Sequence, residues 1–300
     1  SHEVLLLIMA IFRLGAVACP LSLRLPVKEV EKQLSEIDCR LLISDFKIKT
    51  EISLVQVNEW RNTIPVGPFQ EATIDLDQEA TVLFTSGSSG RRKAAIHSYG
   101  NHYYSALGSN ENISLLQNDQ WVLSLPLFHV GGLAILMRCL LSRATVLIPD
   151  ENDKNFTETI QKFLPTHISL VSTQLQRLLK ANLPVSKCIL LGGSAIPQEM
   201  IREAHSRAWP IHTSYGMTEM SSQITTTEKA ADLSHLFTSG KVLSHRKVKI
   251  SADGEIYLSG ETLFQAYVGN EGEALSIFPS GDLGFIDEEG YLHITGRKDN

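Results

Sequence analysis

The sequence ATVLFTSGSSGRRKAAI, residues 80–96, places a loop rich in glycine, hydroxyl groups and cations between two apolar runs. The runs predict two buried strands, one ending at Phe84 and one beginning after Lys93. Gly87 and Gly90 permit backbone angles that point successive N–H groups inward, and Lys93 adds a positive charge. The loop alone fits a phosphate site or a solvated turn, and it lacks the GxxxxGK spacing of the common P-loop.

The composition is that of an ordinary globular protein. The 300 residues are 43% hydrophobic and carry a net charge of −6, which gives no sign of a nucleic-acid binder. Four widely spaced cysteines without a CxxC or Cys/His cluster disfavour zinc and a disulfide framework, so we expect a cytoplasmic protein. No apolar run reaches about 18 residues, and membrane insertion is not expected.

Short apolar strands alternate with amphipathic helices up to about residue 214, which predicts a layered α/β fold with a mostly parallel sheet. The expected strands are 41–44, 80–84, 121–125, 144–148, 168–171, 188–191 and 210–212, and the expected helices are 101–108, 133–141, 156–164, 175–181 and 198–207. Later strands at 247–251, 255–259, 284–287 and 291–295, separated by AspGly and GluGly turns, predict a small antiparallel or barrel-like unit. We therefore divide the chain into a layered part, 1–225, and a small β subdomain, 226–300.

Three later stretches combine glycines with polar side chains beside predicted strands: LLGGSA at 190–195, TSYGMTE at 213–219, and SGD at 280–282 with GRKD at 296–299. Ligands gather at the carboxyl ends of strands in open α/β sheets, so the first two can border a binding site. The second contains an aromatic ring and a carboxylate, which suit a base and a hard cation. Each stretch alone also fits an ordinary turn or polar loop.

In their order and spacing, the loop TSGSSGRRK and these three later stretches resemble those of the adenylate-forming superfamily. This superfamily comprises acyl-CoA synthetases, adenylation domains of peptide synthetases, and luciferases. TSGSSGRRK is similar to the family's phosphate loop, YGMTE to its YGxTE segment, SGD to its TGD-like segment, and GRKD to the GRxxD stretch before its mobile C-terminal domain. The chain departs from the family at Arg92, usually Pro, which can alter loop rigidity, and at Ser280, usually Thr. The resemblance covers essentially the whole chain and implies the layered αβαβα N-terminal domain with a small β-barrel-like subdomain.

The resemblance implies a ligase that joins a carboxylic acid to ATP with Mg²⁺, releases pyrophosphate, and transfers the acyl group to coenzyme A. It implies catalytic roles for Lys93, Thr218, Glu219 and His129, and a metal site at Glu219 and Thr85. The implied nucleotide-binding residues are Thr85, Ser86, Gly87, Ser88, Ser89, Gly90, Gly193, Ser194, Tyr215, Gly216, Asp282 and Arg297. In the family, a lysine of the C-terminal domain also contacts the α-phosphate. Asp299 occupies the hinge position, and we expect both ends of the sequence to be cut and residues 1–300 alone to adenylate very poorly.

The stretch PLFHVGG, residues 126–132, resembles the segment at the family's acyl pocket, where a histidine such as His129 positions or gates the acid. Arg138 lies in an otherwise apolar predicted helix, where a cation requires an anionic partner. Helical spacing does not decide whether His129 and Arg138 both reach the pocket.

KAAIHSY at 93–99, SLPLFHVGG at 124–132 and the spacing to Arg138 resemble the 2-succinylbenzoate–CoA ligases of menaquinone synthesis. In that group an arginine at this position helps to hold the second carboxylate of the acid. The implied substrate-binding residues are His129, Arg138, Gly192, Gly216 and Met217.

Three alternatives stay open at this point: a ligase for a fatty or simple aromatic acid, a non-catalytic nucleotide-binding relative, and a peptide-synthetase adenylation domain. An arginine that points to solvent would favour the first alternative. Failure to bind Mg-ATP would favour the second. A homodimer also stays open, because members of the family are often dimers, and Arg91 and Arg92 receive no role.

Overall fold

The computed structural model describes residues 2–22, 24–45, 52–57, 72–85, 92–149, 156–181, 183, 187–270 and 275–299. The chain is an α/β protein, as predicted, built around a seven-stranded sheet of order β11-β10-β9-β8-β7-β5-β6. Five strands run parallel to one another: β5 (Gln120–Val122), β6 (Thr145–Leu147), β7 (His167–Leu170), β8 (Cys188–Leu191) and β9 (Ile211–Met217). Two antiparallel strands, β10 (Ser222–Thr226) and β11 (Lys241–Val242), extend one edge.

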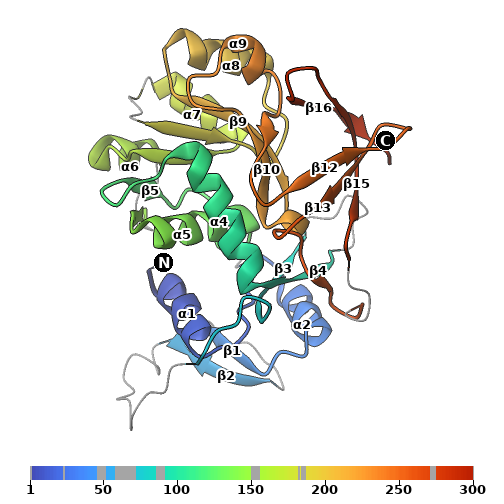
Figure 1. Ribbon diagram of the computed structural model, residues 1–300. Coiled ribbons are helices and arrows are strands. Elements are labelled where there is room, and N and C mark those ends of the chain that lie inside the picture. Colours follow the sequence, from blue (N-terminus) through green and yellow to red (C-terminus); the bar gives the residue numbers. More distant parts are fainter. Residues whose placement is uncertain are drawn as a thin grey trace.

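Helices form layers on both faces of this sheet (Figure 1). One core cluster joins the strands to α6 (Phe156–Phe163), α7 (Ser172–Ala181), α8 (Gln198–Ser206) and the short α9 (Leu233–Leu236). A second cluster includes Trp121, Ile135 and Leu190 and joins them to α4 (Tyr99–Ile113) and α5 (Val130–Ser142). Apart from α9, which was not predicted, these helices lie where the alternating pattern predicts them, with bounds that differ by a few residues.

Helix α4 is present as the sequence predicts, but it is longer than predicted. Ser98 is its N-cap and forms a reciprocal capping box with Asn101. The helix continues past the expected end at Gly108. At that position the helix packs so closely on Ser244 and Arg246 that a side chain would collide with them. The glycine therefore permits close packing rather than ending the helix.

The opening stretch of sequence forms two strands of a three-stranded antiparallel sheet of order β14-β4-β3. Strand β3 (Glu79–Phe84) and strand β4 (Ala94–Ser98) flank the loop, and β14 (Ala266–Tyr267) pairs with β4. The Thr85 N–H donates to the Lys93 carbonyl at 2.8 Å, and the Lys93 N–H donates to Thr85 Oγ1 at 3.3 Å. The two ends of the loop are thus held together, while the predicted phosphate ligands Ser86 to Gly90 lie outside the described residues.

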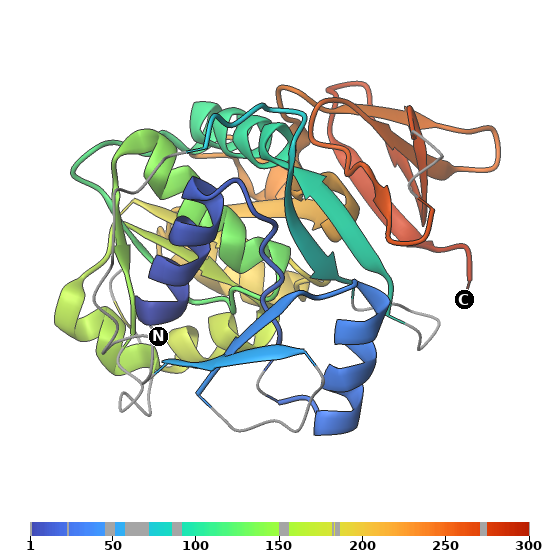
Figure 2. The ribbon, with the colours of Figure 1, turned by 90° about the horizontal axis from the view of Figure 1, so that it is seen from below.

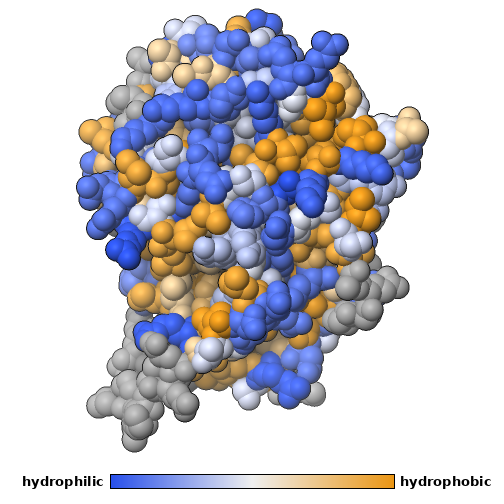
Figure 3. Space-filling view, in the orientation of Figure 1, coloured by the Kyte–Doolittle hydropathy of each residue, from blue (hydrophilic) through white to orange (hydrophobic). Residues whose placement is uncertain are grey.

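The N-terminal part packs beneath this sheet (Figure 2). It contains α1 (His2–Arg13), α2 (Val27–Glu36) and the parallel pair β1 (Leu41–Ser44) and β2 (Ser53–Gln56). Ile8 and Phe12 of α1 enter a core cluster with Leu133 of α5. Among the described residues, no helix is long and apolar enough to cross a bilayer. On the face of the molecule seen in Figure 3, apolar and polar side chains are intermixed.

A four-stranded antiparallel sheet follows, of order β12-β13-β15-β16. Its strands are β12 (Lys247–Ile250), β13 (Glu255–Ser259), β15 (Phe278–Ile286) and β16 (Leu292–Arg297). Two sequence expectations were wrong here. Strand β15 begins well before residue 284, so SGD lies inside a strand, and β9 extends beyond residue 212 through TSYGM. In both cases the polar residues pair with a neighbouring strand, Asp282 with Arg297 and Ser214 with Thr226, which polarity alone does not reveal.

Candidate active site

A cavity of about 1040 Å³ lies between the carboxyl ends of the parallel strands and the four-stranded sheet. It brings together residues from almost the whole chain. The predicted site residues that line it are Thr85, Lys93, His129, Arg138, Gly192, Gly193, Gly216, Met217, Thr218, Glu219, Asp282, Arg297 and Asp299. The described lining does not include Ser194 or Tyr215.

Asp282 is held by donors from two strands, β9 and β16. The Tyr215 hydroxyl donates to its Oδ2 at 2.6 Å, and Arg297 Nη1 donates to its Oδ1 at 2.8 Å. Burial and the nearby Asp282 raise the pKa of Tyr215, so the phenol stays protonated and remains a donor. The carboxylate is fixed in direction and has lone pairs left to accept hydrogen bonds from a sugar hydroxyl.

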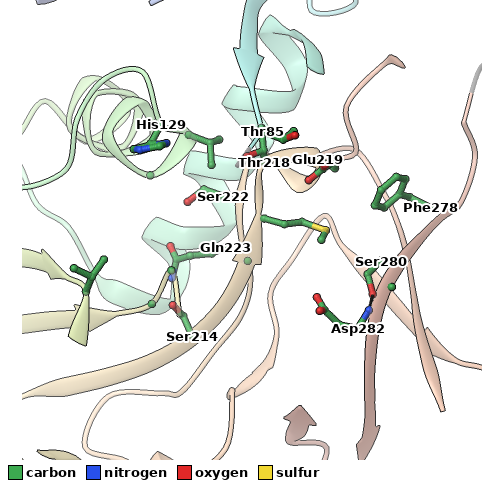
Figure 4. A pocket seen from close by; sticks show the side chains of 18 of the residues that line it. Thr85, His129, Ser214, Thr218, Glu219, Ser222, Gln223, Phe278, Ser280 and Asp282 are labelled. Carbon is green, nitrogen blue, oxygen red and sulfur yellow. Dashed lines mark hydrogen bonds between the residues drawn. The ribbon is translucent and has the colours of Figure 1, made fainter. Parts of the chain in front are cut away.

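Glu219 is an acidic residue that lines the cavity. In Figure 4 it lies beside Thr85 and Thr218, with His129 to the left and Asp282 below. Its Oε1 accepts a hydrogen bond of 2.7 Å from the Tyr267 hydroxyl. The described residues contain no group of three or more His, Cys, Asp or Glu side chains that could enclose a metal. A single carboxylate suits Mg²⁺, which keeps several waters and takes further oxygens from a phosphate group.

Arg138 also lines the cavity and is 1% exposed. Its Nη2 donates to Ser222 Oγ at 3.2 Å, its Nε has no partner, and among the described residues no carboxylate forms an ion pair with it. Burial lowers the pKa of Arg138 to about 10, so it stays charged at neutral pH, while burial raises the pKa of Cys139 to about 12, which removes a thiolate as counter-ion. A buried charge without a partner is costly, and an anion in the cavity would relieve that cost.

The second buried cation, Arg246, behaves differently. It donates to the backbone carbonyls of Tyr104, Ser105, Gln223 and Ser244, so its donors are used within the fold. It does not line the cavity. Of the two arginines that are buried among the described residues, Arg138 is therefore the one with donors available to a ligand.

The surroundings of Arg138 fix its guanidinium group. Its centre lies 5.3 Å from the centroid of the Trp121 ring. The centroid of that ring lies 5.1 Å from that of the His167 ring, and the two rings are tilted by 31°. Ser222 has a φ angle of 106°, a conformation that favours glycine, and its carbonyl approaches Gly216 so closely that a side chain there would collide with it. The glycine of YGMTE thus permits β9 and β10 to meet where Ser222 faces Arg138.

His129 and Arg138 both line the cavity, which settles the geometry that helical spacing left undecided. Helix α5 begins at Val130, and His129 is its extended N-cap residue, so the two side chains do not follow one continuous helix. Burial and the positive charge of Arg92 lower the pKa of His129. His129 is therefore neutral near pH 7 and can act as a hydrogen-bonding group in the cavity.

The sequence did not single out Tyr267, Trp121, Ser222 or Lys298. Lys298 pairs with Asp253 at 2.9 Å and Glu255 at 2.7 Å, which ties the end of β16 to β13 beside Arg297 and Asp299. Trp121 and Tyr267 had no local signal, because an isolated aromatic residue in a strand usually belongs to the core. Lys298 lies within the GRKD stretch, so this motif was the signal in the sequence that could have identified it.

A family model described as AMP-binding enzyme matches residues 1–268. The chain belongs to this family of AMP-binding enzymes. Among its relatives in the family, a 2-succinylbenzoate–CoA ligase of Listeria innocua is 34% identical over 304 residues, and one of Bacillus mycoides is 32% identical over 317 residues. The matches cover 98% and 99% of this chain, which spans 65% and 66% of the length of the two relatives.

Solved structures agree with this assignment to the AMP-binding enzymes. O-succinylbenzoate coenzyme A synthetase from Bacillus subtilis, in complex with ATP and magnesium ion, has a TM-score of 0.92 and 30% identity over 100% of this chain and 68% of that protein. A variant of E. coli MenE in which lysine replaces an arginine, with bound OSB-AMS, has a TM-score of 0.86 and 30% identity over 99% of this chain and 65% of that protein. The N-terminal domain of FACL13 from Mycobacterium tuberculosis, at 21% identity and a TM-score of 0.87, shows the same fold over 99% of this chain and 84% of its own.

Proposed function

We propose that this protein activates 2-succinylbenzoate with ATP and Mg²⁺ to its acyl-adenylate and then transfers the acyl group to coenzyme A, as an AMP-forming acid–thiol ligase of menaquinone synthesis. The observation that carries the proposal is the buried Arg138, which has no anionic partner among the described residues and lines the same cavity as Glu219 and Asp282. The four cysteines are free, which suits the cytoplasm in which we place the reaction.

The groups that line the cavity suit the parts of such an adenylate. Arg138 would bind the carboxylate that does not react, and His129 would orient the acid beside it. The reacting carboxylate would then lie near Thr218 and Glu219, and Asp282 would hold the ribose with Arg297 behind it. Bound in this way, the acid oxygen would lie next to the α-phosphate, which is the geometry that the reaction requires.

In the first step the acid oxygen forms a bond to the α-phosphorus, and the bond from that phosphorus to the pyrophosphate oxygen breaks. Both reactants are anions, so their approach requires positive charge and oriented donors. Lys93 and Thr85, which lie at the ends of the phosphate loop, would stabilise the departing pyrophosphate. Mg²⁺ bound at Glu219 would supply further positive charge at the phosphates. Thr218 would donate to the α-phosphate.

The substrate class follows from the acid end. A fatty acid would fill it with methylene groups and leave the Arg138 charge buried and unpaired. A dicarboxylic acid offers its second carboxylate to that charge through charge-assisted hydrogen bonds. An aromatic dicarboxylic acid therefore fits this end better than a simple fatty or monocarboxylic aromatic acid.

Calorimetric binding of two acyl-sulfamoyl-adenosines tests the proposal, with 2-succinylbenzoyl in one and a fatty acyl chain in the other. The sulfamate stands in for the phosphate of the adenylate. We expect the succinylbenzoyl compound to bind more tightly and Arg138→Ala to weaken it by about 1.5–3 kcal/mol, the range for a lost hydrogen bond to a charged group. Arg143→Ala, an exposed arginine that follows the same helix, is the control. Equal affinity for both compounds would contradict 2-succinylbenzoate as the substrate. If neither compound bound, the proposal that the cavity is an adenylate site would be wrong.

A further inference from the structure

Tyr267 connects two charged groups of the cavity that come from distant parts of the chain. Its hydroxyl donates to Glu219 Oε1 at 2.7 Å, and its ring lies 4.8 Å from Lys93 Nζ. Glu219 follows β9, Lys93 precedes β4, and Tyr267 itself lies on β14, which pairs with β4. A single aromatic side chain therefore contacts both the carboxylate and the cation at the phosphate end.

The ring is held firmly in this position. Phe264 packs edge-on against it at 4.7 Å between centroids, and the Val268 N–H donates to the Ala94 carbonyl at 2.9 Å. A phenol is protonated at neutral pH, so the Tyr267 hydroxyl donates the hydrogen bond that Glu219 accepts. Because the ring cannot easily move, the hydroxyl sets the direction of the carboxylate.

The backbone beside Glu219 is fixed by the same region. The Phe264 N–H donates to the Glu219 carbonyl at 2.8 Å, and the His97 ring lies with Nε2 2.7 Å from the Thr218 carbonyl. Burial lowers the pKa of His97 to about 4, so the ring is neutral and Nε2 carries the proton that it donates. With the main chain held at two consecutive carbonyls, the remaining freedom of Glu219 lies in its side chain, which Tyr267 restrains.

From this geometry we infer that Tyr267 is a positioning residue that aims Glu219 at the metal and steadies Lys93 at the phosphates. The inference rests on the proposed function, since it requires that ATP and a divalent cation occupy the cavity. Tyr267 occupies one oxygen of Glu219 and leaves the other for the cation. Groups that orient a metal ligand in this way typically contribute about 10–100-fold to metal affinity or activity.

The test uses Mn²⁺ with α,β-methylene-ATP, a nucleotide that cannot be cleaved at the reacting bond, and follows Mn²⁺ binding by water-proton relaxation. Tyr267→Phe removes the hydroxyl and keeps the ring over Lys93. We expect it to weaken Mn²⁺ binding in the nucleotide complex by about 10-fold or more, with little change in nucleotide affinity without metal. Tyr99→Phe is the matched control, because it removes a hydroxyl that donates to the Phe12 carbonyl at 3.1 Å away from the cavity.

A double-mutant cycle shows whether the effect passes through Glu219. In a Glu219→Gln background, Tyr267→Phe should cause no further loss of Mn²⁺ affinity. Wild-type Mn²⁺ affinity in Tyr267→Phe, or an equal loss in both backgrounds, would overturn the inference while leaving the nucleotide site intact. Absence of metal-dependent nucleotide binding in the wild type would instead overturn the proposed function, and the inference with it.

Discussion

Arg138 and Ser222 are 84 positions apart in the sequence, yet Nη2 of the arginine donates to Oγ of the serine at 3.2 Å. The arginine comes from α5 and the serine from the first residue of β10, so the contact joins two layers of the fold. The serine holds one arm of the guanidinium group and leaves Nε without a partner. This contact makes Ser222 the nearest structural support of the charge on which the proposed substrate depends.

Two replacements of Ser222 should differ in their free energy of unfolding but weaken ligand binding alike. Its φ angle of 106° is strained for any residue with a side chain, and such strain costs about 1–3 kcal/mol. We expect Ser222→Gly to be more stable than Ser222→Ala by about 1 kcal/mol in urea unfolding, because only glycine relieves the strain. Both variants should bind the succinylbenzoyl compound about 2–10-fold less tightly, since both lose the hydroxyl. An alanine variant as stable as the glycine variant would contradict this account of the backbone.

Asp282→Asn should weaken AMP binding. The asparagine keeps the size of the side chain but loses the charge that Arg297 Nη1 pairs with at 2.8 Å. We expect an affinity loss of about 1.5–3 kcal/mol in calorimetry, the range for a hydrogen bond to a charged group. Asp287→Asn, which breaks a pair with His293 outside the cavity, is the control and should leave AMP affinity unchanged. Equal affinities for the two variants would contradict a ribose role for Asp282.

Stability should fall as the pH drops from about 6.5 to 4. Burial lowers the pKa of His97 from 6.5 to about 4, so the unfolded chain binds a proton in this range that the folded chain does not. The contribution is present above the unfolded pKa and is lost as the pH falls to the folded pKa, in total about 3 kcal/mol. His97→Gln should flatten the dependence of unfolding free energy on pH, whereas the exposed His205→Gln should not. An unchanged slope in His97→Gln would rule out this histidine as its source.

Gly216→Ala should disturb the acid end without touching a charged group. The added methyl group would meet the Ser222 carbonyl and push β9 and β10 apart. We expect a loss of about 1–3 kcal/mol of stability, as for other overpacked sites, together with weaker binding of the succinylbenzoyl compound. Gly296→Ala serves as a stability control, since a side chain there meets no atom within 4 Å. Native-like stability in Gly216→Ala would show that the two strands can separate without cost.

The sequence revealed the α/β class and most elements, because apolar periodicity reports burial directly. It misplaced the starts and ends of strands wherever polar residues continued a strand, as in TSYGM and SGD, because inter-strand hydrogen bonds depend on a partner that local sequence does not show. The division at residue 225 and the individual site roles stay predictions. The apolar surroundings of Arg138 were visible in the sequence, but its contacts with Trp121 and Ser222 were not, since each lies in a different element.

The pairing of Asp282 with Arg297 across β15 and β16 makes this ion pair depend on a distant turn. In an antiparallel hairpin the register is set by the turn, and a slip of one residue moves every side chain of the slipped strand to the other face. Strand β15 also pairs with β13, so such a slip would move the edge strand β16 and carry Arg297 away from Asp282. Inserting one residue between Asp287 and Tyr291 would therefore break the Asp282–Arg297 ion pair while altering neither of its residues.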